Sequence, residues 1–157
     1  MVSAELRVVD PADPVVQQCW LAYFATIAER FDAGYDPERS RHVGLDEVRP
    51  PRGATVVVFL DDQPVACGSV KHHGDWAEVK RVWVSPDARG LGLARRIMAD
   101  LEARAHAQGA AVIRLDTNRT LTEAIALYGK LGYREVQPYN DEPYAHHWFE
   151  KALVSSG

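Results

Sequence analysis

The amino-acid sequence predicts a mixed α+β fold, in which a mostly antiparallel, twisted sheet of about six to seven strands is flanked by about four helices. The first observation behind this prediction is a series of short, β-branched runs separated by turn residues between 53 and 84. The second is a loop with two glycines that leads from the last of these runs into an amphipathic helix. The third is the order strand, helix, strand, strand after residue 110. We expect residues 1–157 to form one domain, because a chain of this length can bury a sufficient core.

The N-terminal third is expected to supply a strand, a helix and a long connection. Residues 5–9 alternate between polar and apolar side chains, as a strand does. Asp13 and Pro14 form a helix start, and apolar residues then recur at three- and four-residue steps as far as Phe31. The connection at 32–53 has charges, glycines and prolines but no periodicity. It is either a functional segment that covers a substrate site or a solvated loop with one short helix.

The rest of the chain alternates between strands and helices with clear stop signals. Gly109 and Gly132 each follow an apolar helical stripe, as glycines that end helices do. Runs of β-branched and aromatic residues mark the strands. The expected order is strands at 55–60, 65–72 and 77–84, a helix at 93–108, a strand at 111–116, a helix at 122–131, and strands at 133–138 and 144–153.

Charge and hydropathy exclude two classes of partner. A formal net charge of −4 provides no concentrated cationic surface, so we expect no nucleic-acid partner. No apolar run approaches the ~18 residues of a membrane-spanning helix, and the N-terminus lacks a signal-peptide pattern. We therefore expect a cytoplasmic protein with no membrane partner.

Cysteines and histidines give no sign of a metal site. Cys19 and Cys67 follow no ligand-like spacing, so they suit a reducing compartment and are expected to be small buried residues. Adjacent histidines at 72–73 and at 146–147 point to opposite faces of their strands, which prevents either pair from chelating one ion. No metal is therefore expected.

Residues 82–96 carry the most informative feature, because they have the pattern of a strand, a glycine-bearing loop and the start of a helix. At such a junction the first backbone N–H groups have no helical acceptor, and the helix dipole adds partial positive charge. Gly90 and Gly92 allow ligand oxygens to approach the backbone closely, and nearby arginines add full charges. The junction therefore predicts a phosphate-binding site. The arginines are Arg89, Arg95 and Arg96.

Spacing narrows the class of phosphate ligand. A dinucleotide-binding loop needs a third glycine at the position of Arg95, and no triphosphate-binding G-x-x-x-x-G-K-[ST] string occurs. A turn without a ligand, before a core helix, is the structural alternative. The string Arg89-x-x-Gly92-x-Ala94 resembles the R/Q-x-x-G-x-G/A signature of the GNAT superfamily of N-acetyltransferases, in which this loop holds the pyrophosphate of acetyl-CoA.

A second string supports the same resemblance. Residues 124–133 are similar to the A-x-x-L-Y-x-K-x-G-[FY] helix near the end of GNAT domains, at the expected distance after the glycine loop. The order of elements matches GNAT domains over nearly the whole chain, although specific motifs are confined to 77–133. The resemblance implies acetyl-CoA as co-substrate. The cofactor-binding residues that it implies are Val82, Trp83, Val84, Arg89, Gly90, Leu91, Gly92, Leu93, Ala94, Arg95, Asn118 and Tyr128.

The resemblance also implies an acid and a base. A tyrosine at the position of Tyr128 often donates a proton to the departing CoA thiolate in the family, whereas a core tyrosine with one hydrogen bond is the structural alternative. The attacking amine must lose a proton, and Glu78, on the strand entering the loop, is the candidate base. Glu78 could equally be a strand glutamate that pairs with a neighbouring cation. Further candidate bases are His146, His147 and Tyr139.

Two other contacts follow from the family pattern. An oxyanion donor is expected from a backbone N–H at a splayed or bulged strand end, which corresponds to 82–84 here. Many relatives carry an asparagine near the CoA arm, where this chain has Leu121. Asn118 is the candidate replacement, and a strand-ending turn is its alternative role.

Two functional classes follow from the resemblance. The first is an N-acetyltransferase that acts on the primary amine of a small molecule or peptide by direct attack. The second is a non-catalytic acyl-CoA-binding or sensing module on the same fold. Tyr128 and Glu78 favour the enzyme. A homodimer formed through exposed strand edges is compatible with this fold.

Overall fold

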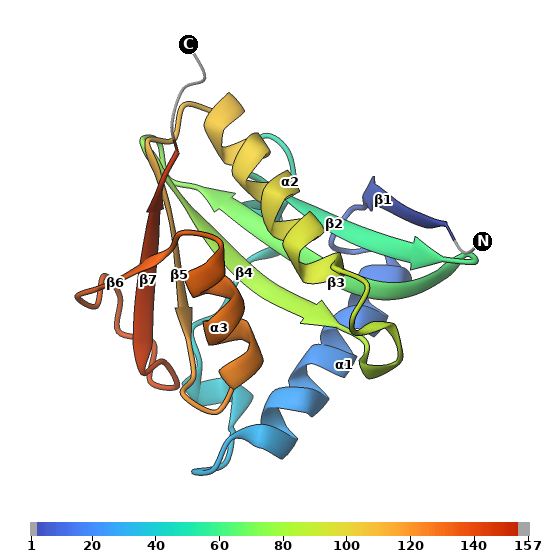
Figure 1. Cartoon of the computed structure of the whole chain (residues 1–157), viewed down its shortest axis with the longest axis horizontal. Helices are drawn as coiled ribbons and strands as arrows, with labels where there is room; N and C mark the ends of the chain where they lie inside the picture. Colours follow the sequence, from blue (N-terminus) through green and yellow to red (C-terminus); the bar gives the residue numbers. More distant parts are fainter. Residues whose placement is uncertain (1–2, 154–157) are drawn as a thin grey trace.

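The computed structural model describes residues 3–153 and shows one sheet of seven strands, in the order β1-β2-β3-β4-β5-β7-β6 (Figure 1). Neighbouring strands pair antiparallel except β4 and β5, which pair parallel. The predicted α+β fold with a mostly antiparallel sheet is therefore confirmed. The strands are β1 (Ala4–Val8), β2 (Gly53–Leu60), β3 (Gln63–His72), β4 (Trp76–Val84), β5 (Val112–Thr117), β6 (Arg134–Val136) and β7 (His147–Ala152).

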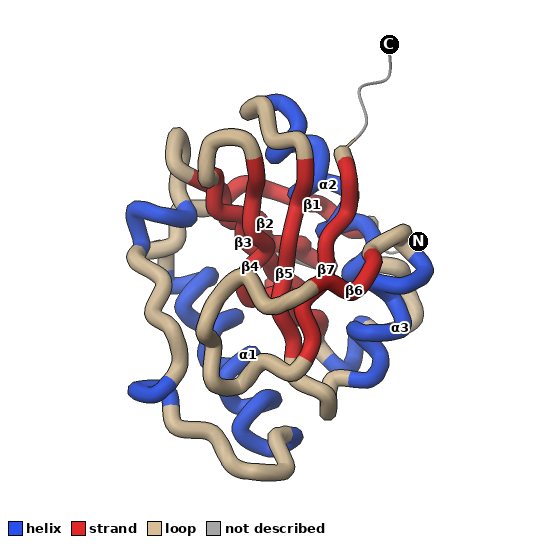
Figure 2. The backbone as a smooth tube through the Cα atoms, turned by 90° about the vertical axis from the view of Figure 1, so that its left-hand side faces the viewer, coloured by secondary structure: helices blue, strands red, loops and turns tan. Residues whose placement is uncertain are grey.

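Three α-helices are present in residues 3–153, where the sequence predicted about four. The connection at 32–53 forms two short 3₁₀ helices instead, because its prolines and glycines interrupt any longer helix. Figure 2 shows this connection as a long loop that runs beside α1. None of the helices in the described part of the chain has the length and apolar character that a membrane crossing requires. The helices are α1 (Pro14–Arg30), α2 (Leu93–Ala107), α3 (Thr122–Lys130) and the 3₁₀ turns Pro37–Arg39, Leu45–Val48 and Pro86–Ala88.

Helix α1 covers one face of the sheet, while α2 and α3 cover the other (Figure 1). Alternate residues of β2 therefore belong to two different cores. Val56 and Val58 pack in the larger core with α2, whereas Val57 packs in the smaller core against α1. Because both faces are covered, β2 has a continuous apolar sequence instead of an alternating one. Cys19 and Cys67 are buried in the smaller core, as expected.

The packing of α2 on β3 gives a stability prediction. Ile97 is fully buried, and a Cβ added to Gly68 would lie 2.6 Å from its Cγ2 atom, so helix and strand are in close contact. Ile97→Ala should lower the free energy of unfolding by roughly 2–5 kcal/mol, because it leaves a cavity. Urea denaturation measures this. Leu21→Ala, at a position that is 71% exposed on α1, is the control and should change stability by less than about 0.5 kcal/mol.

The sheet opens between β4 and β5. These strands pair only from Trp76 to Glu78, and the ladder ends there although both strands continue. On its other side β4 carries a bulge, since Ser69 pairs with Lys80 but Cys67 pairs with Trp83. The two features together separate the ends of β4 and β5 and place the bulge beside the opening.

Candidate active site

The glycine loop that precedes α2 has the geometry of an anion site. Gly90 (φ 85°) and Gly92 (φ 73°) adopt left-handed conformations, and nothing lies within 4 Å of a Cβ added at either position. Gly92 is the N-cap of α2 and has no side-chain cap bond. In residues 3–153, the N–H groups of Leu93, Ala94 and Arg95 have no protein acceptor. The loop therefore presents free donors and the positive end of a helix dipole to open space.

This loop lines a pocket of about 430 Å³ between the end of β4, α1 and α3, which we call the loop pocket. Arg89 and Arg95 line it, whereas the Arg96 guanidinium turns away and donates to a carbonyl oxygen of β1 at 2.8 Å. All of the predicted cofactor-binding residues line the loop pocket except Leu91 and Asn118. Leu91 is 59% exposed at the tip of the loop.

Asn118 lies just beyond β5 and organises a turn. Its Nδ2 donates to the carbonyl oxygen of Tyr144 at 2.8 Å. Its Oδ1 accepts from the backbone N–H of Thr120 at 2.9 Å and from the hydroxyl of that residue at 2.8 Å. These bonds tie the segment before β7 to the end of β5. Asn118 lines a second pocket instead of the loop pocket.

The second pocket, of about 250 Å³, opens where β4 and β5 diverge, and we call it the aromatic pocket. The long connection forms part of its wall and therefore covers a pocket. Its lining residues are Tyr35, Pro37, Glu38, Ser40, Arg41, His42 and Val43. The tyrosines and phenylalanines of the pocket come from α1 and its C-cap, the connection, α3 and the segment before β7: Tyr23, Phe24, Phe31, Tyr35, Tyr128 and Tyr144.

The two pockets meet at one shared wall. The side chains in it come from α1, β4 and α3, so three separate elements define this junction. Molecules bound in the two pockets would therefore come together at this wall. The shared residues are Tyr23, Ile27, Val82, Leu121, Ala124 and Tyr128.

Tyr128 is buried in this shared wall, at 7% exposure. Burial, together with the charge of Asp116, raises the pKa of its hydroxyl to about 12, so the phenol stays protonated at neutral pH. In the described part of the chain, no hydrogen bond engages this hydroxyl, in contrast to Tyr133 nearby, which donates to Glu102 at 2.9 Å. Tyr128 is therefore a free donor between the two pockets.

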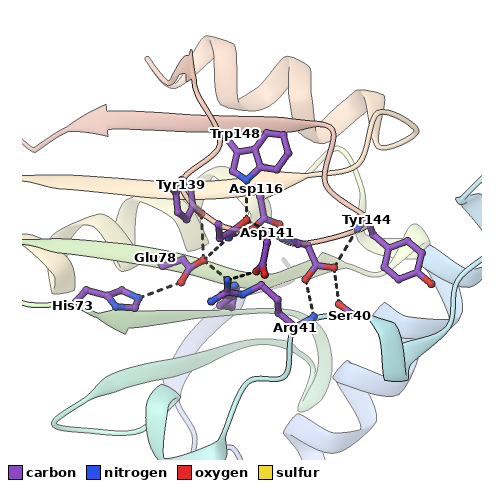
Figure 3. A network of polar contacts seen from close by, with 12 residues as sticks. Ser40, Arg41, His73, Glu78, Asp116, Tyr139, Asp141, Tyr144 and Trp148 are labelled. Carbon is purple, nitrogen blue, oxygen red and sulfur yellow. Dashed lines mark hydrogen bonds and ion pairs between the residues drawn. The ribbon is translucent and has the colours of Figure 1, made fainter.

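Glu78 sits at the centre of a polar network on β4 (Figure 3). It is 3% exposed and lines neither pocket. Burial acts to raise its pKa, but Lys80 and the hydrogen bonds outweigh burial and hold this pKa below its ordinary value. Its carboxylate is thus ionised and already fully engaged. The contacts are Lys80 Nζ at 2.9 Å, His73 Nε2 at 3.2 Å, Tyr139 Oη at 3.3 Å and Asn140 Nδ2 at 3.4 Å.

Asp116, on β5, is a candidate residue that the sequence reasoning missed. It lines the aromatic pocket, and burial, assisted by the charges of Glu78 and Glu142, raises its pKa. Asn140 Nδ2 donates to its Oδ2 at 2.8 Å and also lies 3.4 Å from Glu78 Oε2, so one amide links the two carboxylates. The available signal was an acidic residue at the end of a buried strand that follows the glycine-loop helix.

The other candidate bases lie away from both pockets in the described chain. His146 accepts a hydrogen bond from the backbone N–H of Arg119 at 3.1 Å, and burial lowers its pKa. His147 pairs with Glu135 at 2.8 Å. Tyr139 donates to Glu78, and burial raises its pKa. No group of three or more potential metal ligands occurs within residues 3–153.

Comparison with known proteins agrees with this geometry. The model of the acetyltransferase (GNAT) family matches residues 19–133, a range that contains the glycine loop, all of α3 and the part of α1 from Cys19 onward. The chain is 31% identical over 114 residues to the IAA acetyltransferase of Azospirillum brasilense, covering 71% of this chain and 74% of that protein. It is 32% identical over 98 residues to an uncharacterized N-acetyltransferase of Schizosaccharomyces pombe, covering 60% of each chain.

Solved structures share the fold. A GNAT-family acetyltransferase from Staphylococcus aureus has a TM-score of 0.78 at 13% identity, and the match covers 96% of this chain and 100% of that chain. The PaiA N-acetyltransferase from Thermoplasma acidophilum, solved in complex with coenzyme A, has a TM-score of 0.73 at 14% identity, covering 96% and 99% of the two chains. With the family match over residues 19–133, this chain belongs to the GNAT family of acetyltransferases and is an acyltransferase enzyme.

Proposed function

We propose that the enzyme transfers the acetyl group of acetyl-CoA to the primary amine of a small molecule or peptide by direct attack. The observation that carries this proposal is the shared wall of the two pockets. Acetyl-CoA binds in the loop pocket, with its pyrophosphate on the free N–H groups at the start of α2. The amine enters through the aromatic pocket, and the two meet beside Tyr128. Bringing both reactants together in this way removes much of the entropic cost of a bimolecular step.

The reaction needs two proton movements. The neutral amine attacks the thioester carbonyl carbon, the C–S bond breaks, and the nitrogen loses one proton while the thiolate gains one. Tyr128 stabilises the departing thiolate, because its hydroxyl is protonated and has no other partner in the described residues. A backbone N–H of residues 82–84, which continue past the last β4–β5 pair, serves the oxyanion.

Two carboxylates are candidates for accepting the proton of the amine. The choice of Glu78 stays a prediction, and its four contacts and lowered pKa suit a supporting role. We propose that Asp116 accepts the proton, directly or through water, because it lines the pocket and its pKa is raised. The negative charge of Glu78 contributes to that raised pKa, so the two carboxylates work as a pair.

The pH dependence of the rate separates these roles. A base acts in its ionised form, so kcat/KM should rise with pH through the pKa of Asp116. Asp116→Asn should lower kcat about 10²- to 10⁴-fold and abolish this acidic limb. Glu78→Gln should move the limb to lower pH with a smaller loss of rate, because a like charge that raises the pKa of Asp116 disappears. If Glu78→Gln instead abolishes the acidic limb and Asp116→Asn only shifts it, Glu78 is the base.

Thiol release tests the proposed reaction. The protein is incubated with acetyl-CoA and a panel of primary amines, and free CoA thiol is followed together with the amide product by mass spectrometry. We expect amine-dependent thiol release with one amide formed per thiol. Acetyl-CoA binding without thiol release for any amine would contradict catalysis and favour an acyl-CoA-binding module.

A further inference from the structure

Arg81 stands out among the cations that line the aromatic pocket, because no carboxylate in residues 3–153 pairs with it. Lys80 pairs with Glu78 at 2.9 Å, and Arg41 pairs with Asp141 at 2.8 Å. The guanidinium of Arg81 neither forms an ion pair within 4.0 Å nor donates a hydrogen bond to any described residue, although it is partly buried in the pocket wall. A desolvated cation without a counter-ion is costly, so it points to a ligand that supplies the anion.

Aromatic rings hold this guanidinium in place. Its Cζ lies 4.3 Å from the ring centre of Trp20 and 4.9 Å from that of Phe24, both on α1. Contact with ring faces stabilises the cation without using its N–H donors. The planar group therefore keeps donors available for a partner such as a carboxylate, which it can bind through two parallel hydrogen bonds.

The backbone at Arg81 also points to a function. Its φ of 53° is in the left-handed region, which is rare for a side chain of this size. The residue lies in the bulge of β4, and bulges redirect side chains next to active sites. A strained residue at a bulge, with its charge unpaired in a pocket, is typical of a ligand-binding position.

A complementary charge faces the same pocket. The carboxylate of Asp116 lines it without a cation within ion-pair distance among residues 3–153. Glu142 is engaged elsewhere, because it accepts from Ser40 Oγ at 2.9 Å and from the backbone N–H of Arg41 at 2.8 Å. Tyr23, in the shared wall, is influenced by both charges: burial and Asp116 raise the pKa of its hydroxyl, and Arg81 acts to lower it.

We propose that the acceptor is an amino acid with a free carboxylate, whose carboxylate binds the Arg81 guanidinium while its amine lies beside Asp116 in the aromatic pocket, facing the shared wall. The aromatic rings of the pocket then receive an apolar or aromatic side chain. This inference rests on the proposed acetyl transfer and names the class of its acceptor. The volume of about 250 Å³ suits a small molecule of this kind.

Matched acceptors test the inference. Phenylalanine and phenethylamine differ by the carboxylate alone, as do tyrosine and tyramine. We expect the wild type to acetylate each amino acid with a kcat/KM at least about 10²-fold above that of its decarboxylated amine, mainly through KM. Arg81→Met should remove this preference, because it should lower kcat/KM for the amino acids far more than for the decarboxylated amines. The methionine keeps an apolar stem over the rings and experiences the same backbone strain as the arginine.

Two controls keep the test specific. Arg104→Met removes a guanidinium of α2 that lines neither pocket, and it should retain the preference. Titration of N-acetylphenylalanine, which has the carboxylate but no amine, should show at least about 10-fold weaker binding to Arg81→Met than to the wild type. Arg81→Lys should be intermediate, because it keeps the charge but loses the paired donors.

The outcomes separate this inference from the proposed function. Equal acetylation of amino acids and decarboxylated amines by the wild type would overturn the role of Arg81 and leave acetyl transfer intact. An equal loss for both classes in Arg81→Met would overturn it as well. No acetyl transfer to any member of the panel would overturn the proposed function itself.

Discussion

Gly92→Glu should weaken acetyl-CoA binding by at least about 10²-fold in calorimetric titration. The substitution places a carboxylate next to the free N–H groups of α2, where the pyrophosphate is proposed to bind. It also imposes a side chain on a residue with a φ of 73°. Repulsion between like charges and loss of the helix-terminal donors act in the same direction.

Backbone strain alone must be separated from loss of the anion site. Gly74→Glu is the matched control, because Gly74 has a φ of 81°, equally open surroundings and a place in the β3–β4 turn, outside both pockets. We expect Gly74→Glu to lose stability similarly and to keep wild-type affinity. Equal affinity in the two folded variants would contradict a pyrophosphate site at Gly92.

Tyr128→Phe should lower kcat about 10²-fold or more at saturating acetyl-CoA and amine, with little change in acetyl-CoA affinity. The hydroxyl has no hydrogen-bond partner in residues 3–153, so its removal takes away a donor that is available to the reacting groups. Because its pKa is about 12, the phenol remains protonated across the working pH range and should not produce the acidic limb of the profile.

Two neighbouring tyrosines provide controls for this variant. The ring centre of Tyr133 lies 5.8 Å from that of Tyr128. Tyr133→Phe removes a hydroxyl that donates a hydrogen bond to Glu102, and Tyr133 lines neither pocket. This variant should lower the free energy of unfolding and leave kcat unchanged. Tyr23→Phe tests the other phenol of the shared wall. An unchanged kcat in Tyr128→Phe with a loss in Tyr23→Phe would assign the donor to Tyr23.

Local signals in the sequence predicted most of the fold. Asp13 accepts a hydrogen bond from the Val15 N–H at 2.9 Å and starts α1 at Pro14, as the pattern indicated. Gly92 occupies the N-cap of α2, and β2 follows its apolar run. Helix count was predicted less well, because the connection at 32–53 is shaped by its contacts across the aromatic pocket and not by a periodic pattern.

The candidate site was only partly predictable. The glycine loop and Tyr128 lie within short motifs, and both line the loop pocket, while their roles stay predictions. Asp116 and Arg81 depend on long-range geometry: the early end of the β4–β5 ladder and the bulge of β4. Neither strand separation nor a bulge has a distinctive signal in one sequence, since both are set by pairing between distant segments.

A crystal structure of the protein with acetyl-CoA tests the central claim most directly. We expect the pyrophosphate oxygens to accept hydrogen bonds from the N–H groups of Leu93, Ala94 and Arg95. The thioester should lie at the wall shared by the two pockets, with its sulfur beside the hydroxyl of Tyr128. A pyrophosphate bound away from the glycine loop, or a thioester distant from Tyr128, would contradict the proposed site.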